Sequence, residues 1–178
     1  MLGSGRGATS CYGCRVPALL VLWDIDHTLI DSGGAEVHVY QLVFRDLFGR
    51  DLPDLVPGNV RAMAEMKLHT LRLADHLDLD IGAYGDTAEC RADLVHIARN
   101  KAAIAYCHDF AGSETLLAGD TPLDIAAALS AGARSLGVAT GASTAAELAA
   151  AGADAVLPDL TDPSAVVAAI LGRPPQST

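Results

Sequence analysis

Apolar runs and polar gaps alternate along the chain in a pattern typical of strands and helices that follow one another. Residues 18–25 (ALLVLWDI) form a continuous apolar run, as expected of a strand covered on both faces. A weak alternation predicts a short strand over residues 79–84, and later apolar runs predict strands over 115–118, 135–139 and 155–157. Helical spacing and end signals predict helices over 36–48, 60–74, 91–105, 122–131, 148–151 and 163–171.

This alternation predicts an α/β fold with a doubly wound, three-layer, Rossmann-like parallel sheet, because successive parallel strands need helical crossovers. Local signals support the helix ends: Asn59 is a plausible N-cap, Pro122 suits a first helical position, and Thr144 with Glu147 has capping-box spacing. We expect residues 1–15 to be a disordered leader, residues 16–172 a single core domain and residues 173–178 a tail.

Composition and charge narrow the possible functions. The 178 residues carry a formal net charge of −10, which argues against nucleic acid or an anionic membrane as a partner. No apolar stretch reaches membrane-spanning length, so we expect no membrane segment and a cytoplasmic location. Cys11 and Cys14 form a C-x-x-C without a matching second pair, and we assign them no metal or redox role.

Acidic residues follow two of the predicted strands. Asp24 and Asp26 end the first, and Asp120 and Asp124 follow the strand at 115–118. Any one of them could simply cap a helix or complement its dipole. Both pairs together, at strand ends that share one sheet edge, instead predict a ligand site. Four converging carboxylates repel one another unless a hard cation holds them, and Mg²⁺ is the natural choice.

Two motifs make the resemblance to a known family specific. The segment from Val21 to Ser32 (VLWDIDHTLIDS) resembles the D-x-D-x-T motif of the haloacid dehalogenase (HAD) superfamily, and residues 119–124 (GDTPLD) resemble its G-D-x-x-x-D motif. The similarity extends over most of residues 19–160 and is greatest to phosphoglycolate phosphatase-like hydrolases. It implies a magnesium-dependent phosphatase that acts on a small phosphorylated metabolite through an aspartyl-phosphate.

The resemblance also implies roles for individual residues. Asp24 would be the nucleophile and Asp26 the general acid and base. Mg²⁺ would be held by the Asp24 carboxylate, the backbone carbonyl of Asp26, Asp120 and Asp124. Thr28 would be a substrate-binding residue that orients the loop and does not itself react. Related dehalogenases lack an acid at the position of Asp26, so its presence favours phosphate chemistry.

Two other motifs of the family are incomplete here. Where a Thr or Ser normally binds phosphate, the chain has Pro57, which offers neither a hydroxyl nor a backbone N–H. Asn59 nearby could bind the substrate instead, or only cap the following helix. Arg91 occupies the place of the family's catalytic cation, with Lys67 and Lys101 as rivals on neighbouring helices.

The cap that covers the site in relatives is reduced to residues 33–56, which are expected to keep one helix. Without a full cap, water exclusion and substrate choice both suffer. The open face could be covered by a second copy in a homodimer. Two hypotheses about function follow. The protein is either an active phosphatase with a reduced cap, or a catalytically weak or inactive remnant that binds Mg²⁺ or a protein partner. The four carboxylates favour the enzyme.

Overall fold

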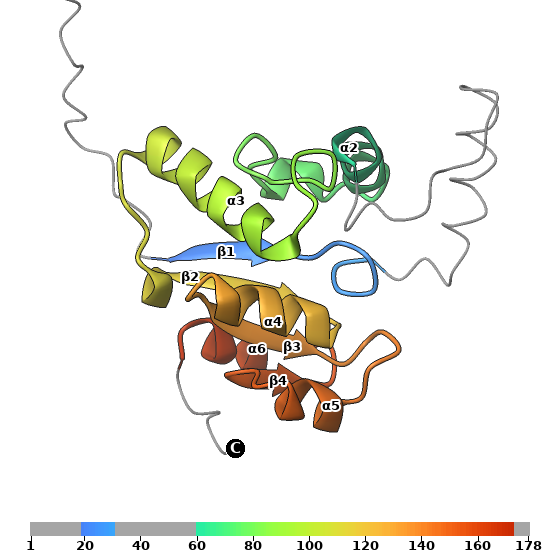
Figure 1. Ribbon diagram of the computed structural model, residues 1–178. Coiled ribbons are helices and arrows are strands. Elements are labelled where there is room, and N and C mark those ends of the chain that lie inside the picture. Colours follow the sequence, from blue (N-terminus) through green and yellow to red (C-terminus); the bar gives the residue numbers. More distant parts are fainter. Residues whose placement is uncertain (1–18, 31–59, 173–178) are drawn as a thin grey trace, which may run out of the picture.

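The computed structural model describes residues 19–30 and 60–172, and within them four strands form one parallel sheet (Figure 1). The strands are β1 (Leu20–Trp23), β2 (Thr115–Gly119), β3 (Arg134–Val138) and β4 (Ala155–Leu157). They lie side by side in the order β1-β2-β3-β4, with β2 and β3 in the middle. The predicted α/β fold with a parallel sheet is confirmed.

Helices connect the strands and cover the sheet. The α-helices are α2 (Arg61–Thr70), α3 (Arg91–Tyr106), α4 (Pro122–Ser130), α5 (Ala145–Ala150) and α6 (Pro163–Ile170). Two short 3₁₀ helices are η1 (Ala74–His76) and η2 (Gly112–Glu114). Among the described residues, no helix combines the length and the apolar composition needed to cross a bilayer.

Alternate residues of the strands supply the two faces of the sheet, as the period of two in a strand requires. On one face, Leu22 and Leu117 pack against α3 and α4 through Val95 and Ala128. A second cluster combines sheet residues with the side chains that α6 contributes: Leu116, Ala118, Leu136, Val138, Ala169 and Ile170. The result is three layers, with the sheet between helices, as the sequence predicts.

The helix ends follow local chemistry. The predicted capping box of α5 is present: the Thr144 hydroxyl accepts from the Glu147 N–H at 3.3 Å, and the Glu147 carboxylate accepts from the Thr144 N–H at 2.8 Å. The helix therefore begins at Ala145, three residues before the predicted start. Gly132 follows α4 with a φ of +64°, a conformation that glycine adopts without steric cost.

The prediction of a strand over residues 79–84 is wrong. The segment forms turns, in which the Gly82 N–H donates to the Leu79 carbonyl at 3.3 Å and the Tyr84 hydroxyl donates to the same carbonyl at 2.7 Å. Just before it, the Asp78 side chain accepts from the Asp80 N–H at 3.2 Å. Such local side-chain bonds give the backbone an alternative to a sheet ladder, which the weak apolar alternation did not reveal.

The helix predicted over residues 60–74 is shorter than expected. It begins at Arg61 after Val60 as the N-cap, and it ends at Thr70. Arg72 then adopts a φ of +58°, which is incompatible with a right-handed α-helix. The next helical residues are those of η1. Several predictions concern residues outside the described ranges. They are the leader (1–15), the cap remnant (33–56) with its helix at 36–48, Pro57, the expected N-cap Asn59 and the tail (173–178).

Candidate functional site

The loop after β1 presents Asp24 at the carboxyl end of the sheet. The Asp24 N–H still pairs with the Ala118 carbonyl of β2, at 2.8 Å, so the backbone of Asp24 is held by the sheet. The chain then turns back tightly: the Ile25 carbonyl accepts from the N–H groups of Leu29 and Ile30, at 3.0 and 2.9 Å. His27 takes a left-handed φ of 59°, which is uncommon for a residue other than glycine and completes the tight turn.

Asp120 and Asp124 come from the end of β2 and the first turn of α4. The Thr121 hydroxyl accepts from the Asp124 N–H at 3.3 Å, and the Asp124 Oδ2 accepts from the Thr121 N–H at 3.1 Å. This capping box starts α4 and fixes the Asp124 side chain at the same time. The two interpretations weighed for Asp124, helix cap and site carboxylate, are therefore compatible.

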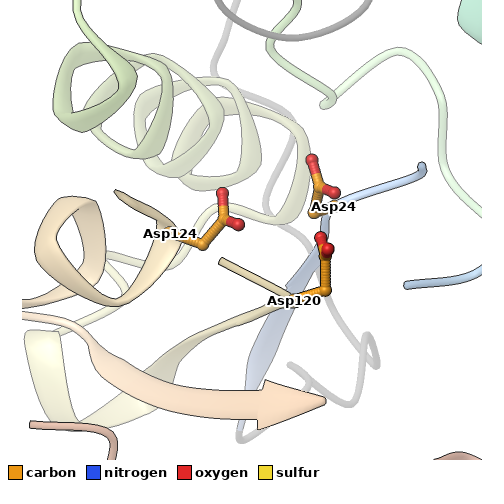
Figure 2. A group of neighbouring side chains, drawn as sticks. All are labelled: Asp24, Asp120 and Asp124. Carbon is orange, nitrogen blue, oxygen red and sulfur yellow. The ribbon is translucent and has the colours of Figure 1, made fainter. Parts of the chain in front are cut away.

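Three carboxylates meet at this edge of the sheet (Figure 2). Oxygen atoms of Asp24, Asp120 and Asp124 all lie within 4.8 Å of one another. Asp120 and Asp124 are buried, with 4% and 3% of their surface exposed. The structure thus brings together three of the four acidic residues that the sequence singles out.

Burial and mutual repulsion make the charged state of these groups costly. The pKa of Asp24 is raised to about 7, first by burial and then by the negative charge of Asp124, while Arg91 opposes the rise. The pKa of Asp120 is also raised, by burial and by Asp124. A carboxylate cluster in this state is stabilised by any added positive charge.

The residues present fit a hard divalent cation. Three carboxylates offer oxygen ligands at the spacing that one ion can bridge, and oxygen is the donor that Mg²⁺ prefers. The pKa values of Asp24 and Asp120 are raised first by burial and then by the charge of Asp124, so a cation bound here would lower both. Asp24, Asp120 and Asp124 are the residues that would hold the ion.

The three candidate cations lie in different places. Arg91, the first residue of α3, forms an ion pair with Asp124 through Nη1, which is also 3.8 Å from Asp24 Oδ1. Lys67 on α2 forms an ion pair with Asp26. Lys101 donates to the Gly82 carbonyl at 2.6 Å. Of these three residues, Arg91 is the one that lies beside Asp24 and Asp124.

Asp26 and Thr28 contribute to the site in different ways. The Asp26 side chain is not in the group of three carboxylates and is paired with Lys67 instead. The hydroxyl of Thr28, a buried residue, lies 3.5 Å from Asp120 Oδ1, so it links the β1 loop to the end of β2. Asn59, the remaining predicted substrate-binding residue, lies outside the described residues.

Two residues for which the sequence predicts no role also shape the site. The Thr140 hydroxyl donates to the His27 carbonyl and so holds the β1 loop from the end of β3. A Cβ atom at Gly141 would overlap the Asp120 carboxylate, so only glycine fits there without a shift. Both follow a predicted strand at the edge that carries the aspartates, and that position was the available signal.

A cavity of about 190 Å³ extends from this cluster along β1. Asp24, Arg91 and Asp124 line one part of it, and apolar residues such as Leu22, Leu79 and Leu94 line much of the rest. Asp26 is not among the lining residues.

Comparison with solved structures supports the fold. The chain is similar to "putative beta-phosphoglucomutase from Bacteroides vulgatus", with a TM-score of 0.56, 15% sequence identity and coverage of 88% of this chain and 90% of the other. A haloacid dehalogenase-like family protein from Streptococcus pneumoniae matches with a TM-score of 0.40, 14% identity and coverage of 85% and 98%. At such identities the first likeness bears on the fold alone.

Comparison with sequences gives the family. No curated protein sequence matches the chain. The family model for HAD-hydrolase-like proteins matches residues 74–163, half of the chain, and this stretch includes Arg91, Asp120 and Asp124. Together with the parallel sheet and the aspartates at its carboxyl edge, this match shows that the chain belongs to the HAD-like hydrolases.

Proposed function

We propose that the protein is a magnesium-dependent phosphatase that hydrolyses a phosphate monoester through an aspartyl-phosphate on Asp24. The observation that carries the proposal is the convergence of Asp24, Asp120 and Asp124 at one edge of the sheet, with Arg91 3.8 Å from the Asp24 carboxylate. Membership of the HAD-like hydrolases supports hydrolysis as the reaction class. A small phosphorylated metabolite is the substrate class that follows.

In the first step, an Asp24 carboxylate oxygen attacks phosphorus. The bond between phosphorus and the ester oxygen breaks, and its electron pair stays on the leaving oxygen. That oxygen takes a proton from the carboxyl group of Asp26 and departs as an alcohol. Asp24 suits the attack because its backbone is fixed by the bond to Ala118, so the carboxylate needs little reorganisation.

In the second step, a water molecule attacks phosphorus and gives a proton to the Asp26 carboxylate. The bond between the Asp24 oxygen and phosphorus breaks, inorganic phosphate leaves, and Asp24 recovers its carboxylate. Magnesium held by Asp24, Asp120 and Asp124 would supply positive charge that offsets the negative charge of the phosphoryl group. Arg91 adds positive charge on the Asp24 side, and Thr28 keeps the β1 loop against Asp120.

Hydrolysis of p-nitrophenyl phosphate by the full chain, with magnesium and with EDTA, tests the proposal. We expect magnesium-dependent turnover that Asp24→Asn abolishes. Asp162→Asn is the matched control, because Asp162 caps α6 and accepts from Ser164 and Ala165 away from the site. A folded wild-type protein that binds magnesium without turnover would overturn the phosphatase and leave a magnesium-binding member of the fold.

A further inference from the structure

Lys67 and Asp26 form an ion pair between α2 and the loop after β1, 41 residues apart in the sequence. The ammonium group donates to Asp26 Oδ1. The side chain of Lys67 is 10% exposed and that of Asp26 is 28% exposed, so the pair is largely shielded from water. Ion pairs in such surroundings keep a defined geometry better than exposed ones.

Helix α2 is anchored close to this ion pair. Leu68, the residue after Lys67, is 2% exposed and packs with Ile30 and Ala74, and Ile25 and Leu29 border the same cluster. Ile25, Leu29 and Ile30 belong to the loop that carries Asp26. Packing thus fixes the base of Lys67 relative to this loop, and its ammonium group reaches Asp26 from a rigid support.

The backbone on either side of Asp26 is restrained as well. The Ile25 carbonyl accepts two hydrogen bonds from the same loop, and the His27 carbonyl accepts one from Thr140. With the backbone held, the main freedom left to Asp26 is rotation of its side chain. The bond from Lys67 to Oδ1 restrains that rotation.

We infer that Lys67 is a positioning residue for Asp26, which it holds in the orientation needed for proton transfer to the leaving oxygen. The inference rests on the proposed function. It divides the positive charge of the site between two residues: Arg91 lies beside the nucleophile Asp24 and the ligand Asp124, and Lys67 serves the acid. Lys67 acts through its bond to Asp26.

Leaving groups of different basicity distinguish this role from simple tethering of α2. Nitrophenolate is a weak base and leaves without a proton, whereas an alkoxide leaves only as its alcohol. A misplaced Asp26 therefore slows cleavage of an alkyl phosphate far more than cleavage of p-nitrophenyl phosphate. The quantity to compare is kcat/KM, because it covers the steps up to departure of the alcohol and excludes hydrolysis of the aspartyl-phosphate.

The experiment measures kcat/KM for butyl phosphate and p-nitrophenyl phosphate with wild type, Lys67→Met, Lys67→Arg, Asp26→Asn and the Asp26→Asn/Lys67→Met double variant. We expect Lys67→Met to lower kcat/KM roughly 10- to 100-fold on butyl phosphate, a part of what a general acid contributes, and about 3-fold or less on p-nitrophenyl phosphate. Lys67→Arg should recover most of the loss. In the Asp26→Asn background, Lys67→Met should cost almost nothing further.

Two controls make a loss of fold recognisable. Lys101→Met removes another partly buried lysine, one that bonds the Gly82 carbonyl, and should leave both esters cleaved as by wild type. Urea unfolding is measured for every variant, and Lys67→Gln replaces Lys67→Met if the latter does not fold. Equal losses on both esters, or additive losses in the double variant, would overturn the inference alone. A wild type inactive on both esters would overturn the proposed function and this inference with it.

Discussion

Arg91 and Asp124 join the first turn of α3 to the first turn of α4 by an ion pair between residues 33 positions apart. Asp124 uses its other oxygen, Oδ2, to accept from the Thr121 N–H. One buried carboxylate is thus shared by a helix cap, an arginine and the proposed cation site. The pair neutralises one of the three carboxylates in the absence of metal.

Removal of Arg91 should therefore weaken the metal-free protein and strengthen its response to magnesium. For Arg91→Met we expect a free energy of unfolding in EDTA about 1–3 kcal/mol lower than wild type, because Asp124 stays buried without its counter-charge. The stabilisation by magnesium should be larger than in wild type, since no arginine competes for Asp124. Urea unfolding with EDTA and with magnesium measures both quantities.

Arg61→Met is the control. Arg61 forms exposed ion pairs with Glu65 and Asp80, so its removal should change the stability little. Equal stability of Arg91→Met and wild type in EDTA would contradict this prediction.

The contribution of Asp24 to the stability of the metal-free protein should fall as the pH rises from about 4 to about 7. Folding raises the pKa of Asp24 from 3.8 to about 7, so over this range the folded chain holds more protons than the unfolded chain. Asp24 therefore stabilises the folded state at low pH. As the pH rises, this contribution to the free energy of unfolding falls by about 2–4 kcal/mol in total. Unfolding in EDTA at a series of pH values, for wild type and Asp24→Asn, isolates the effect.

Asp24→Asn should flatten this pH dependence and be more stable than wild type at pH 8 without metal, because an amide cannot become a repelled charge. The raised pKa of Asp120 acts in the same direction and remains in the variant, so the comparison between the two proteins is what counts. Parallel pH profiles for the two proteins would contradict this prediction, because they would show that Asp24 does not cause the pH dependence.

Magnesium should stabilise the wild-type protein against unfolding, and Asp120→Asn should lose most of this effect. At a concentration one hundred times the Kd, binding to the folded state alone adds about 2.7 kcal/mol. Asp120 is one of the three carboxylates that would hold the ion, and it is 4% exposed. Thermal unfolding in a magnesium titration measures the shift, with Asp162→Asn as the control. An equal shift in Asp120→Asn would place the ion elsewhere.

Gly141→Ala should lower magnesium-dependent turnover at least 10-fold while the protein stays folded. A methyl group there overlaps the Asp120 carboxylate, which must then rotate away from Asp24 and Asp124; misplaced groups of this kind cost about 100-fold in known enzymes. Ala142→Ser changes the exposed neighbour and should leave turnover intact. Wild-type activity in Gly141→Ala would show that Asp120 has room to move.

The part of the fold that the sequence predicts is the part set by local pattern. The apolar runs at residues 115–118 and 135–139 mark buried central strands, and acidic residues after parallel strands must gather at one edge, which is where Asp24 and Asp120 lie. The capping signals of Thr144 and Pro122 likewise depend on only a few neighbouring residues.

The part that escapes prediction depends on contacts between distant segments. The pairing of Lys67 with Asp26 follows from how α2 packs on the β1 loop, and nothing in the helical spacing of α2 specifies that partner. Residues 79–84 fail as a strand because periodicity does not report whether a neighbouring strand is available. Gly141 leaves room for the Asp120 carboxylate at a neighbouring strand end, and only the folded sheet brings these two positions together.

The register of β1 against β2 also sets the order of events during synthesis. Leu20 pairs with Thr115, so the first apolar strand leaves the ribosome about 95 residues before the partner that it has in the described sheet. At typical translation rates that interval lasts roughly 5–20 s. During this time β1 has no β2 to pair with. Asp24, which follows β1, therefore gains its place at the edge of the sheet only after β2 has been made.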